Sequence, residues 1–334
     1  MMHALLVASL SWTPSGSGPL LTGLVAPTFS PFHANGTLDI AGIDRQAAYL
    51  RSTNVSVVFC SGTTGESVDL TVVERKAIAE RWVSLGGFRV IVHVGSDSVV
   101  DAKDMASHAA KIGAWAVAAM PPTFIRPKNV DALVATVGAI AGAAPNLPFF
   151  YYHIPAATFV DLPMRDFLKA ADGKIPNLAG IKYTHYDLMD LQLCMQVANG
   201  KYTLLYGRDQ WLLSAIALGV HGAVGSTYNF NGDMMSTLFN AFDGKPNSLA
   251  AGRATQLAAA SLIAEMDEWA AAYPGMYSLK TVQNLIAANV GASRLPFLPT
   301  SEEAAKDMKK RLMGWCAGLS AVAAKPGWCS KLLH

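Results

Sequence analysis

The sequence predicts an α/β fold: a closed (β/α)8 barrel of the TIM type, followed by a C-terminal helical subdomain. Eight short apolar runs, rich in Val, Ile, Phe and Tyr, recur at intervals of roughly 25–35 residues, the length of a strand–helix unit. None of them is followed by the dinucleotide fingerprint G-x-G-x-x-G or the phosphate loop G-x-x-x-x-G-K-[ST]. These two observations favour a closed barrel over an open doubly wound sheet.

The eight runs are expected to be the strands of the barrel. They are apolar throughout, as strands covered on both faces are. They span residues 21–29, 55–60, 89–95, 115–120, 148–154, 178–184, 203–207 and 222–228.

The segments between the runs have helical spacing. Residues 74–85 and 101–112 place apolar side chains at steps of three and four, and Asp101 and Asp187 stand where helix N-caps are expected. After residue 232 the pattern predicts helices only, over residues 233–243, 248–272, 278–290 and 301–316. The first of these completes the barrel, and the other three form the C-terminal subdomain.

The chain is therefore divided into four parts. Residues 1–19 form a flexible N-terminal extension in which a short targeting segment remains an alternative, residues 20–245 the barrel, residues 246–318 the C-terminal helices and residues 319–334 a peripheral tail. No apolar run approaches the roughly 18 residues that a membrane span requires. We expect no membrane partner and a cytoplasmic location.

The amino-acid composition argues against several classes of protein. Hydrophobic residues make up 51% of the 334 residues and charged residues 15%, which indicates a large buried core. The balance of 26 Lys and Arg against 24 Asp and Glu, without a polybasic run, argues against a nucleic-acid partner. Four scattered cysteines, Cys60, Cys194, Cys316 and Cys329, form no C-x-x-C pair, which argues against a disulfide scaffold and a zinc ribbon.

Lys182 is the candidate nucleophile. Active sites of such barrels lie at the carboxyl ends of the strands, and Lys182 ends the sixth apolar run. Desolvation there disfavours the ammonium form, and a neutral amine can attack a carbonyl carbon. The alternative is a lysine that reaches solvent or pairs with a carboxylate.

Tyr152 precedes Lys182 by one strand–helix unit, so the two side chains should project from adjacent strands at the same end of the barrel. A phenol beside a Schiff base can transfer protons during carbon–carbon cleavage. The alternative is a core aromatic residue with a hydrogen-bonded hydroxyl. His153 alternates to the opposite face, and we assign it a structural role, without catalysis or metal binding.

Thr63 and Thr64 follow the second strand within the segment Ser61-Gly62-Thr63-Thr64-Gly65-Glu66-Ser67. Two hydroxyls flanked by glycines present both side-chain donors and accessible backbone N–H groups. With no Lys or Arg in the segment, a carboxylate suits it better than a polyphosphate. The alternative is a tight loop that caps a helix.

Four motifs in this order resemble the N-acetylneuraminate lyase branch of the dihydrodipicolinate synthase family. They are residues 62–66 (GTTGE), 152–155 (YHIP), 180–182 (GIK) and 225–229 (GSTYN), and the resemblance covers residues 20–318. Each motif alone is weak, whereas the ordered set is specific. The resemblance implies a class I pyruvate aldolase, a homotetramer, with no metal and no other cofactor.

The resemblance also implies roles for individual residues. Lys182 matches the Schiff-base lysine and Tyr152 the proton-transferring tyrosine, and Thr63 and Thr64 match the pair that holds the pyruvyl carboxylate. The contacts to the sugar tail fall on Thr184, Gly207, Asp209, Gln210 and Ser226. For Asp209, a helix cap is the alternative.

The sequence departs from the family pattern at several positions. Ala157 stands where the synthases have a carboxylate-binding Arg, which argues against dihydrodipicolinate synthesis. Residues 156–159 read AATF where lyases commonly read Ala-Leu-(Ser/Thr)-Gly, and Gln210 replaces a Glu. Phe124 aligns with a Tyr that reaches into the neighbouring subunit, so that relay is expected to be absent or replaced. Arg208 either meets an acidic substrate tail or faces solvent, and we expect the second.

The resemblance thus predicts reversible cleavage of N-acetylneuraminate to pyruvate and N-acetylmannosamine, in sialic acid catabolism. One alternative is an aldolase for another 2-keto-3-deoxy sugar acid, suggested by Gln210, Arg208 and the altered 158–159 segment. The other is a non-catalytic barrel that binds a keto acid, which the intact set of Lys182, Tyr152 and the hydroxyl residues argues against. The expected partners are a small sugar acid and pyruvate.

Overall fold

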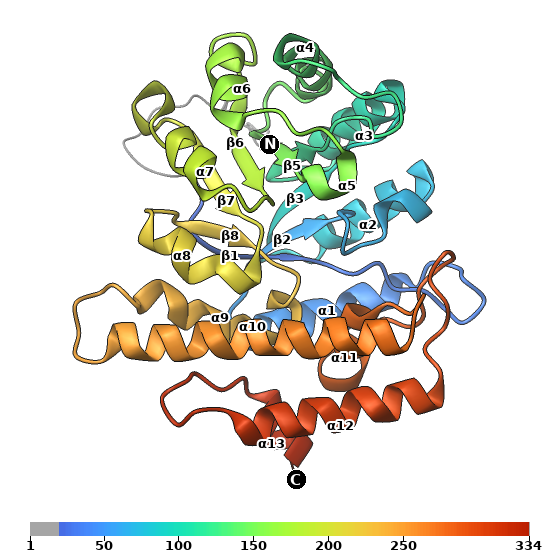
Figure 1. Cartoon of the computed structure of the whole chain (residues 1–334). Coiled ribbons are helices and arrows are strands. Elements are labelled where there is room, and N and C mark those ends of the chain that lie inside the picture. Colours follow the sequence, from blue (N-terminus) through green and yellow to red (C-terminus); the bar gives the residue numbers. More distant parts are fainter. Residues whose placement is uncertain (1–19, 334) are drawn as a thin grey trace, which may run out of the picture.

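Eight parallel strands close into a barrel in chain order, with β1 hydrogen-bonded to β8 (Figure 1). The computed structural model describes residues 20–333. The strands are β1 (Gly23–Pro27), β2 (Val57–Cys60), β3 (Arg89–His93), β4 (Ala116–Ala119), β5 (Phe149–His153), β6 (Leu178–Tyr183), β7 (Thr203–Tyr206) and β8 (Gly222–Val224). The predicted (β/α)8 barrel is confirmed, and each strand lies within its predicted apolar run.

Helices surround the barrel and extend beyond it at the C-terminus (Figure 1). They are α1 (Ile40–Ser52), α2 (Val72–Ser84), α3 (Val99–Lys111), α4 (Val130–Ala141), α5 (Pro155–Thr158), α6 (Met164–Ala171), α7 (Leu188–Cys194), α8 (Leu212–Ala217), α9 (Tyr228–Ser236), α10 (Ser248–Ala272), α11 (Ser278–Ile286), α12 (Glu302–Gly318) and α13 (Trp328–Leu333). Short 3-10 turns occur between some of them.

Several local predictions differ from the structure. The helix predicted over residues 278–290 ends at Ile286. The eighth strand ends at Val224 rather than at residue 228, because the chain turns there and Tyr228 N–H bonds the Gly225 carbonyl to begin α9. Asp101 is not the N-cap of α3. Ser98 fills that role, with its Oγ accepting from Asp101 N–H at 3.2 Å, and Asp101 adds negative charge to the first turn. Asp187 is confirmed as the N-cap of α7.

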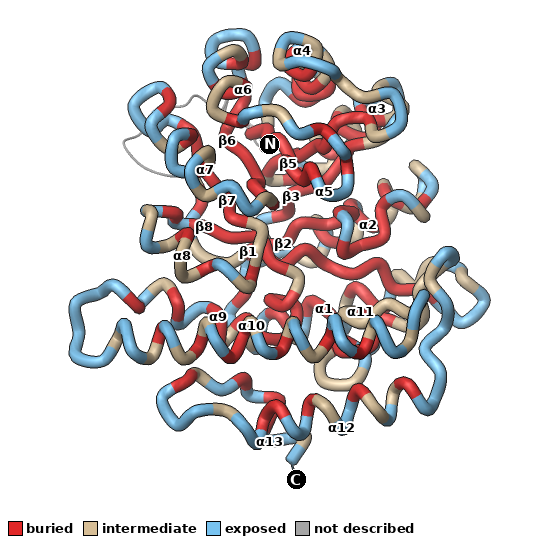
Figure 2. Tube along the Cα trace, viewed as in Figure 1, coloured by how far each residue is buried: buried red, intermediate tan, exposed pale blue. Residues whose placement is uncertain are grey.

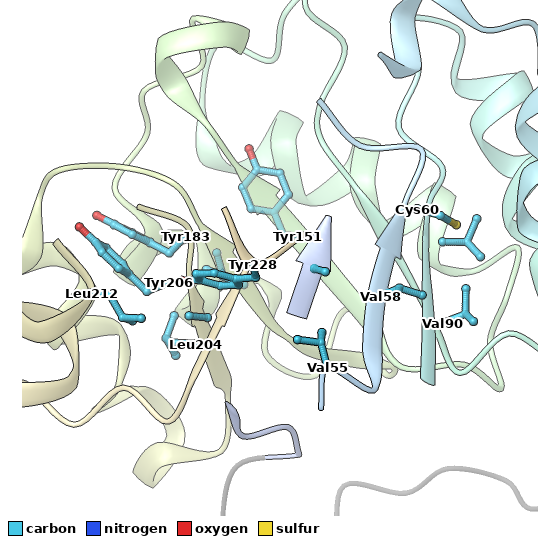
Figure 3. Close-up of a cluster of buried hydrophobic side chains, with 14 of the residues drawn as sticks. Val55, Val58, Cys60, Val90, Tyr151, Tyr183, Leu204, Tyr206, Leu212 and Tyr228 are labelled. Carbon is cyan, nitrogen blue, oxygen red and sulfur yellow. The ribbon is translucent and has the colours of Figure 1, made fainter. Parts of the chain in front are cut away.

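The strands separate two hydrophobic layers. Residues such as Val57, Phe59 and Phe150 fill the interior of the barrel, while their neighbours, such as Val58 and Tyr151, pack against the surrounding helices. Figure 2 shows the strands buried and the outer turns of the helices exposed. The close-up in Figure 3 shows part of the outer layer. Because side chains alternate along a strand, a single step in register decides whether a residue reaches the barrel interior.

The C-terminal helical subdomain is present as predicted. The long helix α10 lies between the barrel and α12 (Figure 1). The buried indole of Trp269 on α10 donates to the carbonyl of Ala304 on α12 at 2.9 Å. Within residues 20–333, no helix combines the length and the apolar character that a membrane crossing needs. The predicted extension over residues 1–19 lies outside the described residues.

The segment after residue 319 is more than a peripheral tail. It folds back as α13, and a disulfide joins Cys329 to Cys316 on α12. Trp328 stacks on Trp315 with ring centroids 5.5 Å apart, and its indole donates to Asn231 Oδ1 at 2.7 Å. The cysteine spacing did not indicate this disulfide, because the pairing depends on the chain reversing after α12. Cys60 and Cys194 remain buried free thiols.

Candidate active site

A pocket of about 430 Å³ opens at the carboxyl ends of the strands. Its walls include every residue that the sequence analysis assigned to catalysis or binding. These are Thr63, Thr64, Tyr152, Lys182, Thr184, Gly207, Asp209, Gln210 and Ser226. The closed barrel thus brings together residues that come from the ends of five strands.

Lys182 points into the barrel because its neighbours on β6, Ile181 and Tyr183, belong to the outer layer. Its side chain is buried, and its Nζ lies 3.8 Å from the ring centroid of Tyr152 and 4.1 Å from that of Phe59. Burial lowers the pKa of Lys182, and the neighbouring Tyr152 and Asp209 oppose this shift. A larger fraction of the amine is therefore neutral and nucleophilic at a given pH.

Tyr152 is directly opposite Lys182 in the register between β5 and β6. Its phenol oxygen lies 3.1 Å from Thr63 Oγ1, in the loop after β2. Tyr152 also meets Phe59 edge-on, with ring centroids 5.7 Å apart. The phenol is therefore held beside the Lys182 amine and hydrogen-bonded to the residue predicted to hold a carboxylate.

The loop after β2 presents hydroxyl and N–H donors to the pocket. Thr64 Oγ1 lies 2.7 Å from Ser226 Oγ in the loop after β8. The turn itself uses the N–H groups of Gly65, Glu66 and Ser67, which bond carbonyls within residues 62–63. Among the hydrogen bonds found within residues 20–333, none engages the N–H groups of residues 63 and 64. This arrangement suits a bound carboxylate, which accepts several such donors.

A buried ion pair anchors this loop to the C-terminal subdomain. Lys280 Nζ on α11 donates to Glu66 Oε1 at 2.7 Å and to the Ser30 carbonyl at 2.8 Å. Glu66 Oε2 accepts from Arg294 N–H at 3.1 Å. Burial raises the pKa of Glu66 and lowers that of Lys280, while the pairing opposes both shifts. Since Glu66 adopts a left-handed backbone conformation, with φ of 54°, these contacts hold the turn in an otherwise unfavourable shape.

Thr184, Gly207 and Asp209 form the wall at the ends of β6 and β7. Thr184 Oγ1 is buried and has no hydrogen-bond partner within residues 20–333, which leaves it free to bind a ligand. Position 207 requires glycine because a Cβ there would overlap Thr184 Oγ1. Asp209 does not cap a helix; its Oδ2 accepts from Thr227 N–H at 3.0 Å and from Thr227 Oγ1 at 2.7 Å. Burial raises the pKa of Asp209, and the bonds from Thr227 partly offset that rise.

The expectation that Arg208 faces solvent is wrong. Arg208 lines the pocket, and its guanidinium lies 4.2 Å from the ring centroid of Tyr186. Tyr186 is 54% exposed, so the stacked pair stands at the pocket mouth. Stacking on an aromatic face holds the guanidinium in place. Alternation along β7 does not predict where the Arg208 side chain points, because Arg208 lies beyond the last residue of that strand.

Other lining residues were missed because they come from distant segments. Tyr277 donates a long hydrogen bond of 3.4 Å to the Thr64 carbonyl, and Ile263, Met266 and Asp267 of α10 complete the wall. No motif in the sequence marks them. Phe124 is 85% exposed and does not line the pocket. The outward orientation predicted for His153 is confirmed by its contacts with Tyr183 and Tyr151 outside the barrel.

Comparisons with known proteins show the family and the fold of the chain. Residues 20–314 match the dihydrodipicolinate synthetase family. N-acetylneuraminate lyase A of Xenopus laevis is 43% identical over 228 residues, which cover 66% of this chain and 74% of that protein. N-acetylneuraminate lyase of Gallus gallus is 37% identical over 298 residues, covering 87% and 95%. The structure of N-acetylneuraminate lyase (sialic acid aldolase) from Aliivibrio salmonicida superposes with a TM-score of 0.82 at 34% identity, covering 90% and 98%.

The buried pair of Glu66 and Lys280 generates a stability prediction. Lys280→Met should lower the free energy of unfolding by about 3–5 kcal/mol, because it leaves a buried carboxylate without its partner. Adding Glu66→Gln to Lys280→Met should recover part of that loss, because the remaining group is uncharged. Urea unfolding followed by circular dichroism measures both effects.

Lys245→Met is the matched control. Its ammonium pairs with Asp243 at 3.1 Å, but the Lys245 side chain is 79% exposed. Such surface pairs contribute only about 0–1 kcal/mol. Equal losses for Lys280→Met and Lys245→Met would show that the buried pair has no special role in stability.

Proposed function

The chain belongs to the dihydrodipicolinate synthetase family, and from this premise we propose that it is a class I aldolase. It cleaves N-acetylneuraminate reversibly to pyruvate and N-acetylmannosamine, in sialic acid catabolism. One observation carries the mechanism: the buried amine of Lys182, packed on two aromatic rings, stands in a pocket lined by hydroxyl groups. The substrate follows from the relatives that are named N-acetylneuraminate lyase.

The proposed cycle begins at Lys182. Its neutral amine attacks the C2 ketone of the substrate and loses water to form an iminium ion, the protonated Schiff base. Tyr152 donates its phenol proton to the departing water, and the phenolate then accepts the proton of the C4 hydroxyl as the C3–C4 bond breaks with the iminium as electron sink. The resulting enamine takes this proton at C3, water hydrolyses the iminium to release pyruvate, and the proton freed in that step restores the Tyr152 phenol. The 3.1 Å contact between Tyr152 and Thr63 supports this role by holding the phenol in place.

The carboxylate of the substrate is proposed to bind the loop after β2. Thr63 and Thr64 supply hydroxyl and N–H donors, and Ser226 stands 2.7 Å from Thr64. The polyol tail then extends toward Thr184, Gly207, Asp209 and Gln210. The unpartnered Thr184 Oγ1 supports this direction, because a buried hydroxyl without a partner is costly until a ligand satisfies it. No metal or other cofactor takes part in the proposed cycle.

Ala157 argues against dihydrodipicolinate synthesis. It lies on α5, directly after the strand that carries Tyr152, where the synthases have a carboxylate-binding Arg. An alanine offers no charge-assisted bond to a second carboxylate.

We also propose a homotetramer that acts in the cytoplasm. Phe124 and Ile125, side by side after β4, are 85% and 84% exposed, and a neighbouring subunit would remove this apolar pair from water. At this location we expect the Cys316–Cys329 disulfide to be reduced, because few disulfides persist in reducing compartments. The proposal includes no nucleic-acid or membrane partner.

A substrate panel tests the function. N-acetylneuraminate should give the highest kcat/KM for pyruvate release, measured with a coupled dehydrogenase assay, among N-acetylneuraminate and other 2-keto-3-deoxy sugar acids. A higher value for another sugar acid would reassign the substrate. The absence of pyruvate release from every compound would indicate a non-catalytic keto-acid-binding barrel.

Borohydride trapping of the imine tests whether Lys182 is the nucleophile. Incubation with pyruvate and borohydride should reduce the imine and attach the pyruvyl group to Lys182, detected by peptide mass. Lys182→Ala should lose both labelling and turnover, and Lys182→Arg should also fail, because a guanidinium stays protonated. Tyr152→Phe should still form imine but cleave the substrate about 10²–10⁴-fold more slowly, the usual contribution of general acid–base catalysis. Label on a different lysine would contradict the mechanism.

A substitution of Gln210 tests whether this residue binds the polyol tail of the substrate. Gln210→Glu should lower KM for N-acetylneuraminate by about 5- to 30-fold, corresponding to about 1–2 kcal/mol for a charged hydrogen-bond acceptor, and leave kcat nearly unchanged. Steady-state kinetics gives both constants. Gln192→Glu is the matched control, since Gln192 is exposed on α7 and does not line the pocket. An unchanged or higher KM for Gln210→Glu would remove Gln210 from the tail site.

A further inference from the structure

Three potential metal ligands meet on the outer side of the barrel wall. His153 is the last residue of β5 and follows Tyr152, so its side chain points away from the pocket. His185 lies two residues beyond the end of β6, and Asp161 lies in the segment between α5 and α6. The register pairs His153 with Tyr183, which places the ends of both strands side by side. The three side chains therefore converge from three separate segments.

The geometry is close to that of a metal site. One potential ligand atom from each residue lies within 4.8 Å of those of the other two. His185 Nε2 lies 3.8 Å from Asp161 Oδ1, and the two imidazole rings are perpendicular, with centroids 5.4 Å apart. Bonds of about 2.0–2.2 Å to a tetrahedral zinc ion would place ligand atoms roughly 3.4 Å apart. Side-chain rotation in the exposed Asp161 and the partly exposed His185 can supply this small contraction.

His153 provides an independent indication of a missing ligand. It is 1% exposed, and its Nδ1 is fully buried with no hydrogen-bond partner. Within residues 20–333 this nitrogen is an exception, because buried polar atoms in proteins almost always have a hydrogen-bond partner.

We propose that His153, His185 and Asp161 bind a divalent transition-metal ion, with Zn²⁺ as the expected occupant. Two imidazoles and one carboxylate suit Zn²⁺, Co²⁺ or Ni²⁺, whereas Mg²⁺ prefers oxygen ligands throughout. Three protein ligands leave a fourth position for water. This assignment replaces the purely structural role that the sequence suggested for His153.

The site is placed to position the pocket wall rather than to take part in the reaction. An ion there would join the end of β5 to the segments that carry Asp161 and His185. The neighbours Ile154, Thr184 and Tyr186 line the pocket on the inner side. Binding of the ion would therefore restrict the movement of the wall that faces the substrate tail. The Lys182 amine lies inside the barrel, on the other side of this wall.

Metal titration tests the proposal directly. Tag-free full-length protein, treated with EDTA and dialysed, is titrated with ZnCl2 in a calorimeter. We expect one ion per chain, a higher unfolding temperature with Zn²⁺, and no binding of Mg²⁺. His185→Asn and Asp161→Asn should each weaken Zn²⁺ binding by at least about 10- to 100-fold, the loss that follows even from removing an outer-shell partner.

Two surface pairs provide matched controls. His108 lies 2.8 Å from Glu80, and His33 lies 3.9 Å from Asp39, but neither pair belongs to a three-residue cluster within the described chain. His108→Asn and His33→Asn should keep full Zn²⁺ affinity. Co²⁺ gives a second readout, because tetrahedral coordination produces visible absorption bands that should vanish in Asp161→Asn.

Three outcomes would overturn the proposal. They are no Zn²⁺ binding by the parent protein, unchanged affinity in both His185→Asn and Asp161→Asn, and an equal loss in His108→Asn. If His185→Asn fails to fold, Asp161→Asn decides the question, because Asp161 is exposed and its replacement removes only a surface carboxylate.

Discussion

The hydrogen bonds between β1 and β8 close the barrel, and the candidate active site depends on this closure. They bring the loop after β8 next to the loop after β2, so that Ser226 reaches Thr64 across 162 residues of sequence. Asn229 reinforces the junction by donating to the Pro27 carbonyl, at the end of β1, at 2.8 Å. In an open sheet these two loops would lie at opposite edges, and the proposed carboxylate site would not exist.

Because side chains alternate along each strand, the two faces of the barrel wall hold different groups. On β5, Tyr152 faces the pocket while Tyr151 and His153 face the helices, and on β6 Lys182 faces the pocket beside Tyr183. The inner face thus holds the groups proposed for catalysis. The outer face holds the packing core and, one residue from Tyr152, the proposed metal ligand. A shift of one residue in either strand would exchange these roles.

Two buried lysines show how surroundings set the behaviour of one chemical group. Lys280 is paired with Glu66 at 2.7 Å and bonds a carbonyl, so its charge is compensated and the lysine serves as a structural anchor. Burial lowers the pKa of both lysines, but Lys182 packs on the aromatic faces of Tyr152 and Phe59, whereas a paired carboxylate opposes the shift at Lys280. Aromatic faces stabilise a cation far less than a carboxylate does, which favours a nucleophilic amine. The anchor in turn fixes the loop on which the proposed carboxylate site depends.

The amino-acid sequence alone determined the barrel and the centre of the pocket. Apolar runs at regular spacing identified the strands, and their carboxyl ends identified Lys182, Tyr152, Thr63 and Thr64 as candidates at one end of the barrel. These features depend on periodicity within a strand and on the common direction of parallel strands, both of which are encoded locally. Ser226 was indicated only by the resemblance of the ordered motifs to the family.

The tertiary structure decided what depends on distant segments folding together. It placed Arg208 on Tyr186 in the pocket, added Tyr277 and α10 to the wall, and joined Cys316 to Cys329. It also brought His153, Asp161 and His185 together. None of these contacts follows from a local period, because loop paths and helix packing are set by the whole core rather than by neighbouring residues.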